Sequence, residues 1–122
     1  MQGVIEMGGN YVRADAFKRN TFSINITSGG YGPQGFEDVI LMDNTGNRTI
    51  SLRATNSAYY RASTNMRVFT IIDSAGTAQT SPITISASGS ETINGSNNYV
   101  INTQYGSVKI GTTGDGKWFI LP

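Results

Sequence analysis

The stretch that decides the fold is residues 82–121, PITISASGSETINGSNNYVINTQYGSVKIGTTGDGKWFIL. It contains several short runs in which apolar and polar residues alternate, as in Ile83-Thr84-Ile85, and this period of two is typical of a half-buried β-strand. Asn94-Gly95 interrupts one run, and both residues tolerate the positive φ angles that a tight hairpin turn needs. The glycine-rich segment 113–116 interrupts another. The stretch therefore predicts a succession of short strands joined by tight turns.

The last predicted strand is apolar on both faces. It contains four consecutive apolar residues, Trp118, Phe119, Ile120 and Leu121. A strand of this kind is buried on both sides, either within the fold or under a partner. We therefore expect these four residues to lie in the core or in a contact between copies of the chain.

The earlier part of the chain continues the pattern of short strands. Alternation predicts a strand over 21–27, and residues 37–42 and 48–54 are predicted to form a hairpin around the turn at 43–47. A further strand is predicted over 67–73. Residues 13–19 suit one helical turn but are too short for a stable helix. Two Asp-x-x-Gly turns, starting at Asp43 and Asp73, hint at a repeat of hairpins, although the residues between them do not align.

Composition supports an all-β fold. The chain has 122 residues, only 14% of them charged, and Ile and Val (13 and 6) far outnumber Leu (3). β-Branched side chains fit the pleated surface of a sheet. We predict a single all-β domain of eight to ten short strands, a small antiparallel β-sandwich or barrel, with residues 1–20 as a possible N-terminal arm. A core of this modest size, with a strand that is apolar on both faces, favours association between copies of the chain.

The residue types present argue against catalysis and metal binding. Histidine and cysteine are absent, which removes the usual general base and any thiol chemistry. Glu37 and Asp38 are adjacent and point to opposite faces of a strand, so they cannot act as a pair. Asp43, Asp73 and Asp115 lie in turns that explain them without chemistry, which leaves Glu91 alone. No Asp-x-Asp-x-Asp spacing offers a calcium site. We expect neither an enzyme nor a metal site.

Charge and hydropathy exclude other partners. The net charge is +1 and no block of basic residues occurs, so we do not expect nucleic acid to bind. No apolar stretch is long enough to span a bilayer, and the first residues lack a secretion signal.

One glycine motif needs separate consideration. Gly30, Gly32 and Gly35 match the G-x-G-x-x-G pattern of dinucleotide-binding proteins. That site needs a helix directly after the glycines, but residues 36–42 predict a strand. Pro33 also removes an amide donor from the loop. We therefore expect no cofactor here, and interpret the segment as a loop with Tyr31 at its tip.

The order of turns and strands in residues 68–121 resembles a β-structural module of tailed bacteriophages. The matching positions are Asp73 and Gly76, the PITI of residues 82–85, the TING of 92–95, the YGSV of 105–108 and the DGKWFIL of 115–121. Proteins with this module include tail fibres and capsid decoration or head-fibre proteins. The resemblance implies a β-rich, usually homotrimeric virion component, made in the host bacterial cytoplasm and located on the capsid surface.

Residues 1–67 lie outside that resemblance, and we expect them to contain the contacts with the virion. The candidates are apolar residues of the possible arm, the tip of the glycine loop, and a polar connection: Val4, Ile5, Met7 and Tyr11; Tyr31; Tyr59, Tyr60 and Arg61. Tyr and Arg are enriched at interface hot spots. Packing within the fold is the other interpretation of the adjacent tyrosines.

Two functions are consistent with these observations. The first is a capsid decoration protein that binds the major capsid protein or another virion protein. The second is a tail-fibre or receptor-binding module that recognises a bacterial surface polysaccharide or protein. We expect the first, because fibre tips usually end a much longer chain.

Overall fold

The computed structural model describes residues 23–34, 37–57 and 67–122. This part of the chain contains nine β-strands and no helix, which confirms the all-β prediction for it. The helical turn considered at 13–19 and the possible arm lie outside the described residues. In chain order the strands are β1 (Ser23–Ile26), β2 (Val39–Met42), β3 (Thr49–Ser51), β4 (Arg67–Ile72), β5 (Ile83–Ser86), β6 (Thr92–Ile93), β7 (Asn98–Ile101), β8 (Ser107–Thr112) and β9 (Lys117–Leu121).

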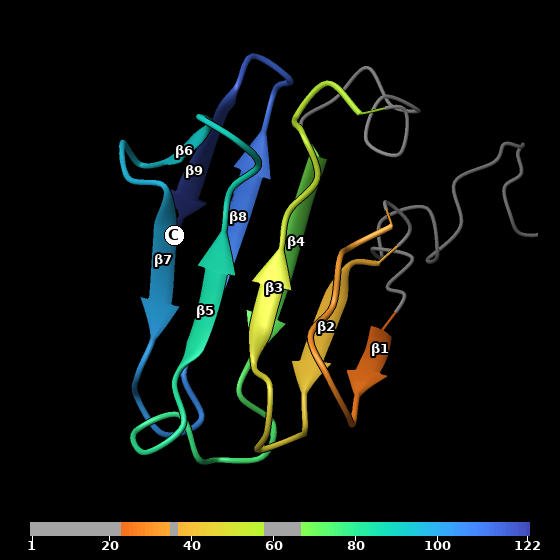
Figure 1. Ribbon diagram of the computed structural model, residues 1–122, viewed down its shortest axis with the longest axis vertical. Coiled ribbons are helices and arrows are strands. Elements are labelled where there is room, and N and C mark those ends of the chain that lie inside the picture. The colour runs from red at the N-terminus through yellow and green to blue at the C-terminus, as the bar shows by residue number, and fades with distance from the viewer. Residues whose placement is uncertain (1–22, 35–36, 58–66) are drawn as a thin grey trace, which may run out of the picture.

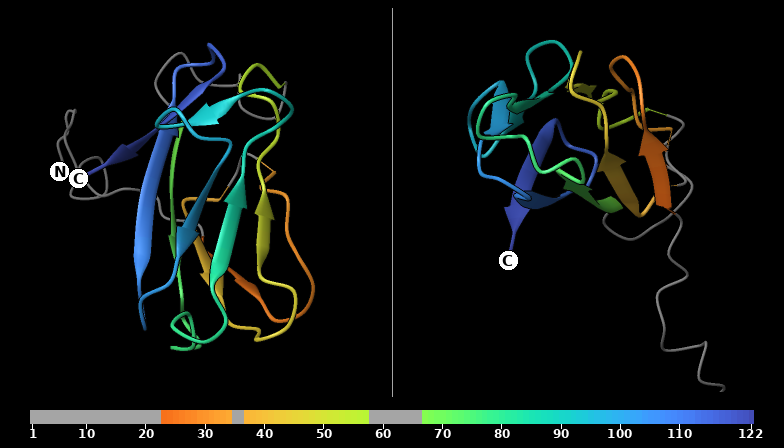
Figure 2. Two further views of the ribbon diagram at one scale, coloured as in Figure 1. Left: turned by 60° about the vertical axis from the view of Figure 1, so that its left-hand side comes forward. Right: turned by 90° about the horizontal axis from the view of Figure 1, so that it is seen from below.

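The strands form two sheets that face each other as a sandwich (Figure 1 and Figure 2, right). The six-stranded sheet has the order β1-β2-β4-β8-β9-β6, and the three-stranded sheet has the order β3-β5-β7. The prediction of an antiparallel architecture is wrong. β1 with β2, β2 with β4, β3 with β5 and β6 with β9 are parallel pairs, so both sheets are mixed.

Residues 37–54 do not form the predicted hairpin. β2 pairs with β1 and β4 in the six-stranded sheet, whereas β3 pairs with β5 in the three-stranded sheet. The turn between β2 and β3 therefore carries the chain from one sheet to the other. Met42 before the turn and Ile50 after it are both fully buried, because they enter the same core from opposite sides. We call such a unit, two consecutive strands in different sheets joined by a turn, an arch.

Neighbouring arches stack side by side. The β2–β3 arch lies beside the β4–β5 arch, with β2 parallel to β4 and β3 parallel to β5. A shorter arch precedes them, because β1 runs parallel to β2 and Tyr31 forms a parallel bridge with Ile50. On the other side, the β7–β8 arch packs with its strands antiparallel to β5 and β4. The stack explains why parallel and antiparallel pairs occur together.

Backbone hydrogen bonds tie each turn to the preceding arch. The amide of Asp43 donates to the carbonyl oxygen of Ile26 at 3.0 Å, and the amide of Ala75 donates to that of Met42 at 3.4 Å. The turns that start at Asp43 and Asp73 thus occupy corresponding places in the stack. The repeat suggested by the two Asp-x-x-Gly turns is a repeat of stacked arches and not of hairpins.

The predicted turns in residues 82–121 are present. Asn94 and Gly95 have φ angles of 48° and 89° and form a tight turn between Ile93 and Ser96. β6 nevertheless pairs with β9 and not with β7. Residues 113–116 join β8 and β9 into an antiparallel hairpin.

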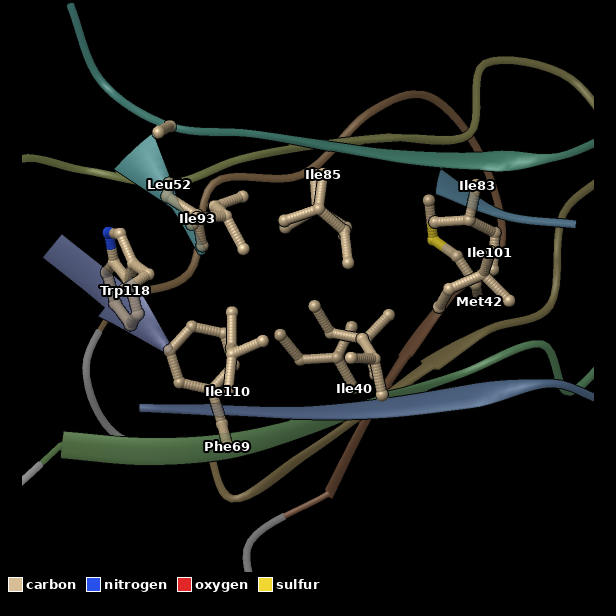
Figure 3. Packing of buried hydrophobic residues seen from close by; sticks show 14 of the residues in the cluster. Ile40, Met42, Leu52, Phe69, Ile83, Ile85, Ile93, Ile101, Ile110 and Trp118 are labelled. Atoms are coloured by element: carbon tan, nitrogen blue, oxygen red, sulfur yellow. The ribbon is translucent and has the colours of Figure 1, made fainter. Parts of the chain in front are cut away.

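The core lies between the two sheets and is rich in isoleucine (Figure 3). Trp118 is its largest buried side chain, and its ring meets that of Phe69 edge to face with the centroids 5.6 Å apart. Burying a side chain such as Ile or Phe contributes roughly 1.5–3 kcal/mol. The core residues are Ile26, Ile40, Met42, Ile50, Leu52, Phe69, Ile71, Ala78, Ile83, Ile85, Ala87, Ile93, Ile101, Val108, Ile110 and Trp118.

Candidate interaction surface

β9 shows how the doubly apolar strand is used. Trp118 is fully buried and Ile120 packs against the core, so both point inward. Phe119 alternates with them, points outward and is 40% exposed. The strand is therefore buried on its inner side within one chain, while its outer side is left for other contacts.

Inward-pointing buried side chains also alternate with outward-pointing ones in the other strands of the six-stranded sheet. In β2 and β4 the buried residues Ile40, Met42, Phe69 and Ile71 point inward. The residues that alternate with them point outward and are half-buried. Thr70 is the polar member of this outward set. The apolar members, together with those of β9, are what we call the outer apolar face: Val39, Leu41, Val68, Ile72, Phe119 and Leu121.

The register brings these residues into rows across the strands. Leu41 of β2 lies opposite Ile72 of β4. In a second row Gly111 lies between Val68 and Phe119. Lys109 is exposed and lies beside Leu121, so one row includes a cation. An apolar surface that contains an exposed aromatic residue is typical of the centre of a protein–protein interface.

Two charged residues take a different place, at the turn end of the stack. Arg48 and Asp73 form a salt bridge in which Nη2 and Oδ1 are 2.5 Å apart, and both side chains are buried. Arg48 also donates to the carbonyl oxygens of Met42 at 2.9 Å and Ser81 at 2.5 Å, and to Thr77 Oγ1 at 3.0 Å. One guanidinium group therefore connects the β2–β3 arch to the β4–β5 arch. We call this group of contacts the Arg48–Asp73 cluster.

Asp73 connects a third element to the same cluster. Its carboxylate accepts hydrogen bonds from the amides of Gly76 at 3.1 Å, Ala78 at 2.9 Å and Tyr105 at 3.0 Å. Tyr105 belongs to the turn between β7 and β8. Burial raises the pKa of Asp73, but the hydrogen bonds from Arg48 and from backbone amides outweigh it and lower the pKa to about 2.

The other well-placed carboxylates also hold loops. Glu37 is fully buried and accepts hydrogen bonds from the Tyr31 hydroxyl and from the amide of Gln34, the latter at 2.8 Å. Glu91 accepts from the amide and hydroxyl of Thr55 at 3.0 and 3.1 Å. Within the described ranges, no group of three or more acidic residues is arranged to hold a metal ion.

Tyr31 is the one predicted contact residue that the structure describes outside β9. It is half-buried, packs against the core and forms backbone hydrogen bonds with Thr49 and Ser51 of β3. It is thus part of the sheet edge and not the tip of a projecting loop. The other predicted contact residues lie outside the described residues: Val4, Ile5, Met7, Tyr11, Tyr59, Tyr60 and Arg61.

The sequence analysis predicted neither the outer apolar face nor the buried position of Arg48. The outer apolar face had a signal, because the VILM of residues 39–42 is apolar on both faces, as β9 is. Arg48 had none, since an arginine at the start of a predicted strand is ordinarily exposed.

The comparisons with known proteins add no relative. No protein-family model matches the chain, and no curated protein sequence matches it. In the part of the chain that the structure describes, no helix has the length and hydropathy needed to span a membrane.

Proposed function

We propose that the chain is a virion structural protein of a tailed bacteriophage, a capsid decoration (cement or head-fibre) protein that binds the capsid shell as a homotrimer. The proposal excludes catalysis and places the protein on the capsid surface. It is supported by the resemblance of residues 68–121 to phage structural modules. The observation that carries it is the outer apolar face, whose Phe119 is 40% exposed in the single chain.

The outer apolar face is the part of the surface that we assign to contacts between copies. Its residues are apolar and belong to regular strands, so they offer a rigid surface that needs no ordering on association. Removing these apolar side chains from water favours association through the hydrophobic effect. Thr70 and Lys109 lie side by side in the middle row of this face, so a contact there would also have to accommodate one hydroxyl and one cation.

The alternative function is a tail-fibre or receptor-binding module for a bacterial surface polysaccharide or protein. Exposed tyrosines favour it, since Tyr99 is 37% and Tyr105 is 64% exposed. Their rings combine an apolar surface with a polar hydroxyl, which suits a partly polar partner.

Imaging of the phage particle distinguishes the two functions. For a decoration protein we expect many copies spread over the shell, each with the density of a trimer. A few copies at the tail would establish the alternative instead. Light scattering of the free protein tests the assembly separately, because a stable monomer at micromolar concentration would contradict the homotrimer.

A further inference from the structure

Among the strands of residues 23–34, 37–57 and 67–122, β1 lies at one edge of the six-stranded sheet and has no described strand beyond it (Figure 1). Its sequence, Ser-Ile-Asn-Ile, contains no charge and no proline. Natural edge strands are usually protected by such residues, by bulges or by being very short. The opposite edge of this sheet follows that rule, because β6 has two residues and a tight turn directly after it. The edge at β1 is therefore suited to a further strand.

The core is also incompletely covered at this end. Ile24 and Tyr31 pack against the core but are only half-buried, whereas the corresponding Ile40 and Ile50 of the next arch are fully buried. The turn after β1, residues 27–30, is exposed throughout. No described part of the chain therefore covers the first arch as each of the following arches is covered.

Residues 4–12 repeat the sequence pattern of this first arch. Ile5-Glu6-Met7 matches Ile24-Asn25-Ile26, apolar residues on both sides of a polar one. Two adjacent glycines and then a tyrosine follow in both segments, Tyr11 in the first and Tyr31 in the second. The spacing is similar but not identical, and Tyr11 precedes Tyr31 by 20 residues. Ile5 precedes Ile24 by 19 residues, while Ile24 precedes its partner Ile40 by 16 and Tyr31 precedes its partner Ile50 by 19.

We propose that residues 4–12 of the same chain dock on the open edge of β1 as a further arch of the stack. Ile5 and Met7 then cover the core beside Ile24, Glu6 lies beside Asn25, and Tyr11 extends the three-stranded sheet next to Tyr31. The connecting residues 13–22 are long enough, because ten extended residues reach about 33 Å and the sheets are about 10 Å apart. Only seven residues, 32–38, make the equivalent crossing before β2.

Cysteine cross-linking of the free protein tests this docking, since the natural chain has no cysteine. Glu6→Cys with Asn25→Cys places two thiols on neighbouring strands, about 5 Å apart. We expect a short bifunctional thiol reagent to join them within one chain about tenfold faster than in the control pair Glu6→Cys with Ser51→Cys. Ser51 is exposed on the outer side of the other sheet. Equal rates for the two pairs would overturn the proposal.

A mixture of two single variants distinguishes the same chain from a second copy. If Glu6→Cys chains cross-link to Asn25→Cys chains, and the double variant gives no product within one chain, then the segment docks on a neighbouring copy and the proposal is wrong.

Amide hydrogen exchange gives an independent readout that needs no cross-link. In Ile5→Asp/Met7→Asp we expect the β1 amides that point away from β2 to lose protection, while Glu6→Gln leaves them protected. Unchanged protection in the double variant would also count against docking. Neither experiment involves a phage particle, so this inference can fail without affecting the proposed function. If it holds, attachment to the virion does not depend on a free N-terminal arm.

Discussion

The Arg48–Asp73 cluster and the outer apolar face differ in how much of their side-chain surface a partner could contact. The cluster holds two opposite charges, the residue types usually searched for function, but both are buried and their hydrogen bonds end on three neighbouring elements. The outer apolar face holds no chemistry, but part of it remains exposed in the single chain. The buried charges therefore serve the fold, and under the proposed function the exposed apolar groups serve assembly.

This contrast predicts that substitutions in the two regions separate stability from assembly. Changes in the Arg48–Asp73 cluster should lower the free energy of unfolding. Changes on the outer apolar face should alter the number of chains that associate.

The largest effect is expected for Arg48→Met. The substitution leaves the Asp73 carboxylate buried without its cation, and breaking a buried ion pair in this way costs about 3–5 kcal/mol. Urea unfolding followed by circular dichroism measures the loss. Lys117→Met removes the same charge at an exposed position and is the control. Equal losses in the two variants would show that the cluster does not hold the arches together.

The second effect is a pH dependence that comes from Asp73. Its pKa is about 2 in the folded protein, below the value of about 3.9 expected in an unfolded chain. The ionised group therefore contributes its full stabilisation, about 2–3 kcal/mol, above about pH 5, and this contribution is lost as the pH falls toward and through 2.

Unfolding free energies at a series of pH values test this dependence. We expect the difference between the natural protein and Asp73→Asn to narrow between pH 5 and pH 2. Asp115→Asn, at an exposed turn residue, should show no such narrowing. A difference that stays constant over this range would argue against the lowered pKa.

A smaller loss, about 1–2 kcal/mol, is expected for Gly76→Ala in the turn that the cluster closes. Gly76 has a φ of +72°, and an added Cβ would lie 2.3 Å from the ring of Tyr105. Because that ring is 64% exposed and can move, the backbone conformation should account for most of the loss. Gly46→Ala is the matched control from the preceding arch, since no atom lies within 4 Å of its added Cβ. Thermal unfolding should give a clearly lower melting temperature for Gly76→Ala than for Gly46→Ala.

The smallest effect on the fold, at most about 1 kcal/mol, is expected for Phe119→Asp on the outer apolar face. Its effect on assembly should be the largest, because a charge buried in an apolar interface opposes association. Light scattering should give the mass of a single chain, with an unchanged circular-dichroism spectrum. Val100→Asp is a close control, since Val100 is 41% exposed on the outer side of the other sheet. If both variants retain the natural mass, the outer apolar face is not the contact between copies.

The positions of the strands were predictable from the sequence, whereas the neighbouring strands with which they pair were not. Alternation located β1, β5 and β8, because the period of two depends only on which side of a strand is buried. It does not specify which strand lies alongside. The turn after Asp43 suits a hairpin as well as an arch, and only the tertiary structure decides between them.

The candidate surface was predictable in part. β9 was identified because its apolar run has no polar interruption, and the same argument applied to β2 would have located Val39 and Leu41. The Arg48–Asp73 salt bridge joins residues 25 positions apart through a fold that the sequence pattern does not specify.

The arches also have a kinetic consequence. The two strands of an arch share no hydrogen-bond ladder, so a single arch gains almost nothing by forming alone and must meet its neighbours before its backbone groups are paired. Contacts between distant parts of a chain are slow to form, which raises the barrier to folding. When the interactions of the native stack are absent from the transition state for folding, the native protein also unfolds slowly. We therefore expect this small domain to persist by a long unfolding lifetime more than by a large equilibrium stability.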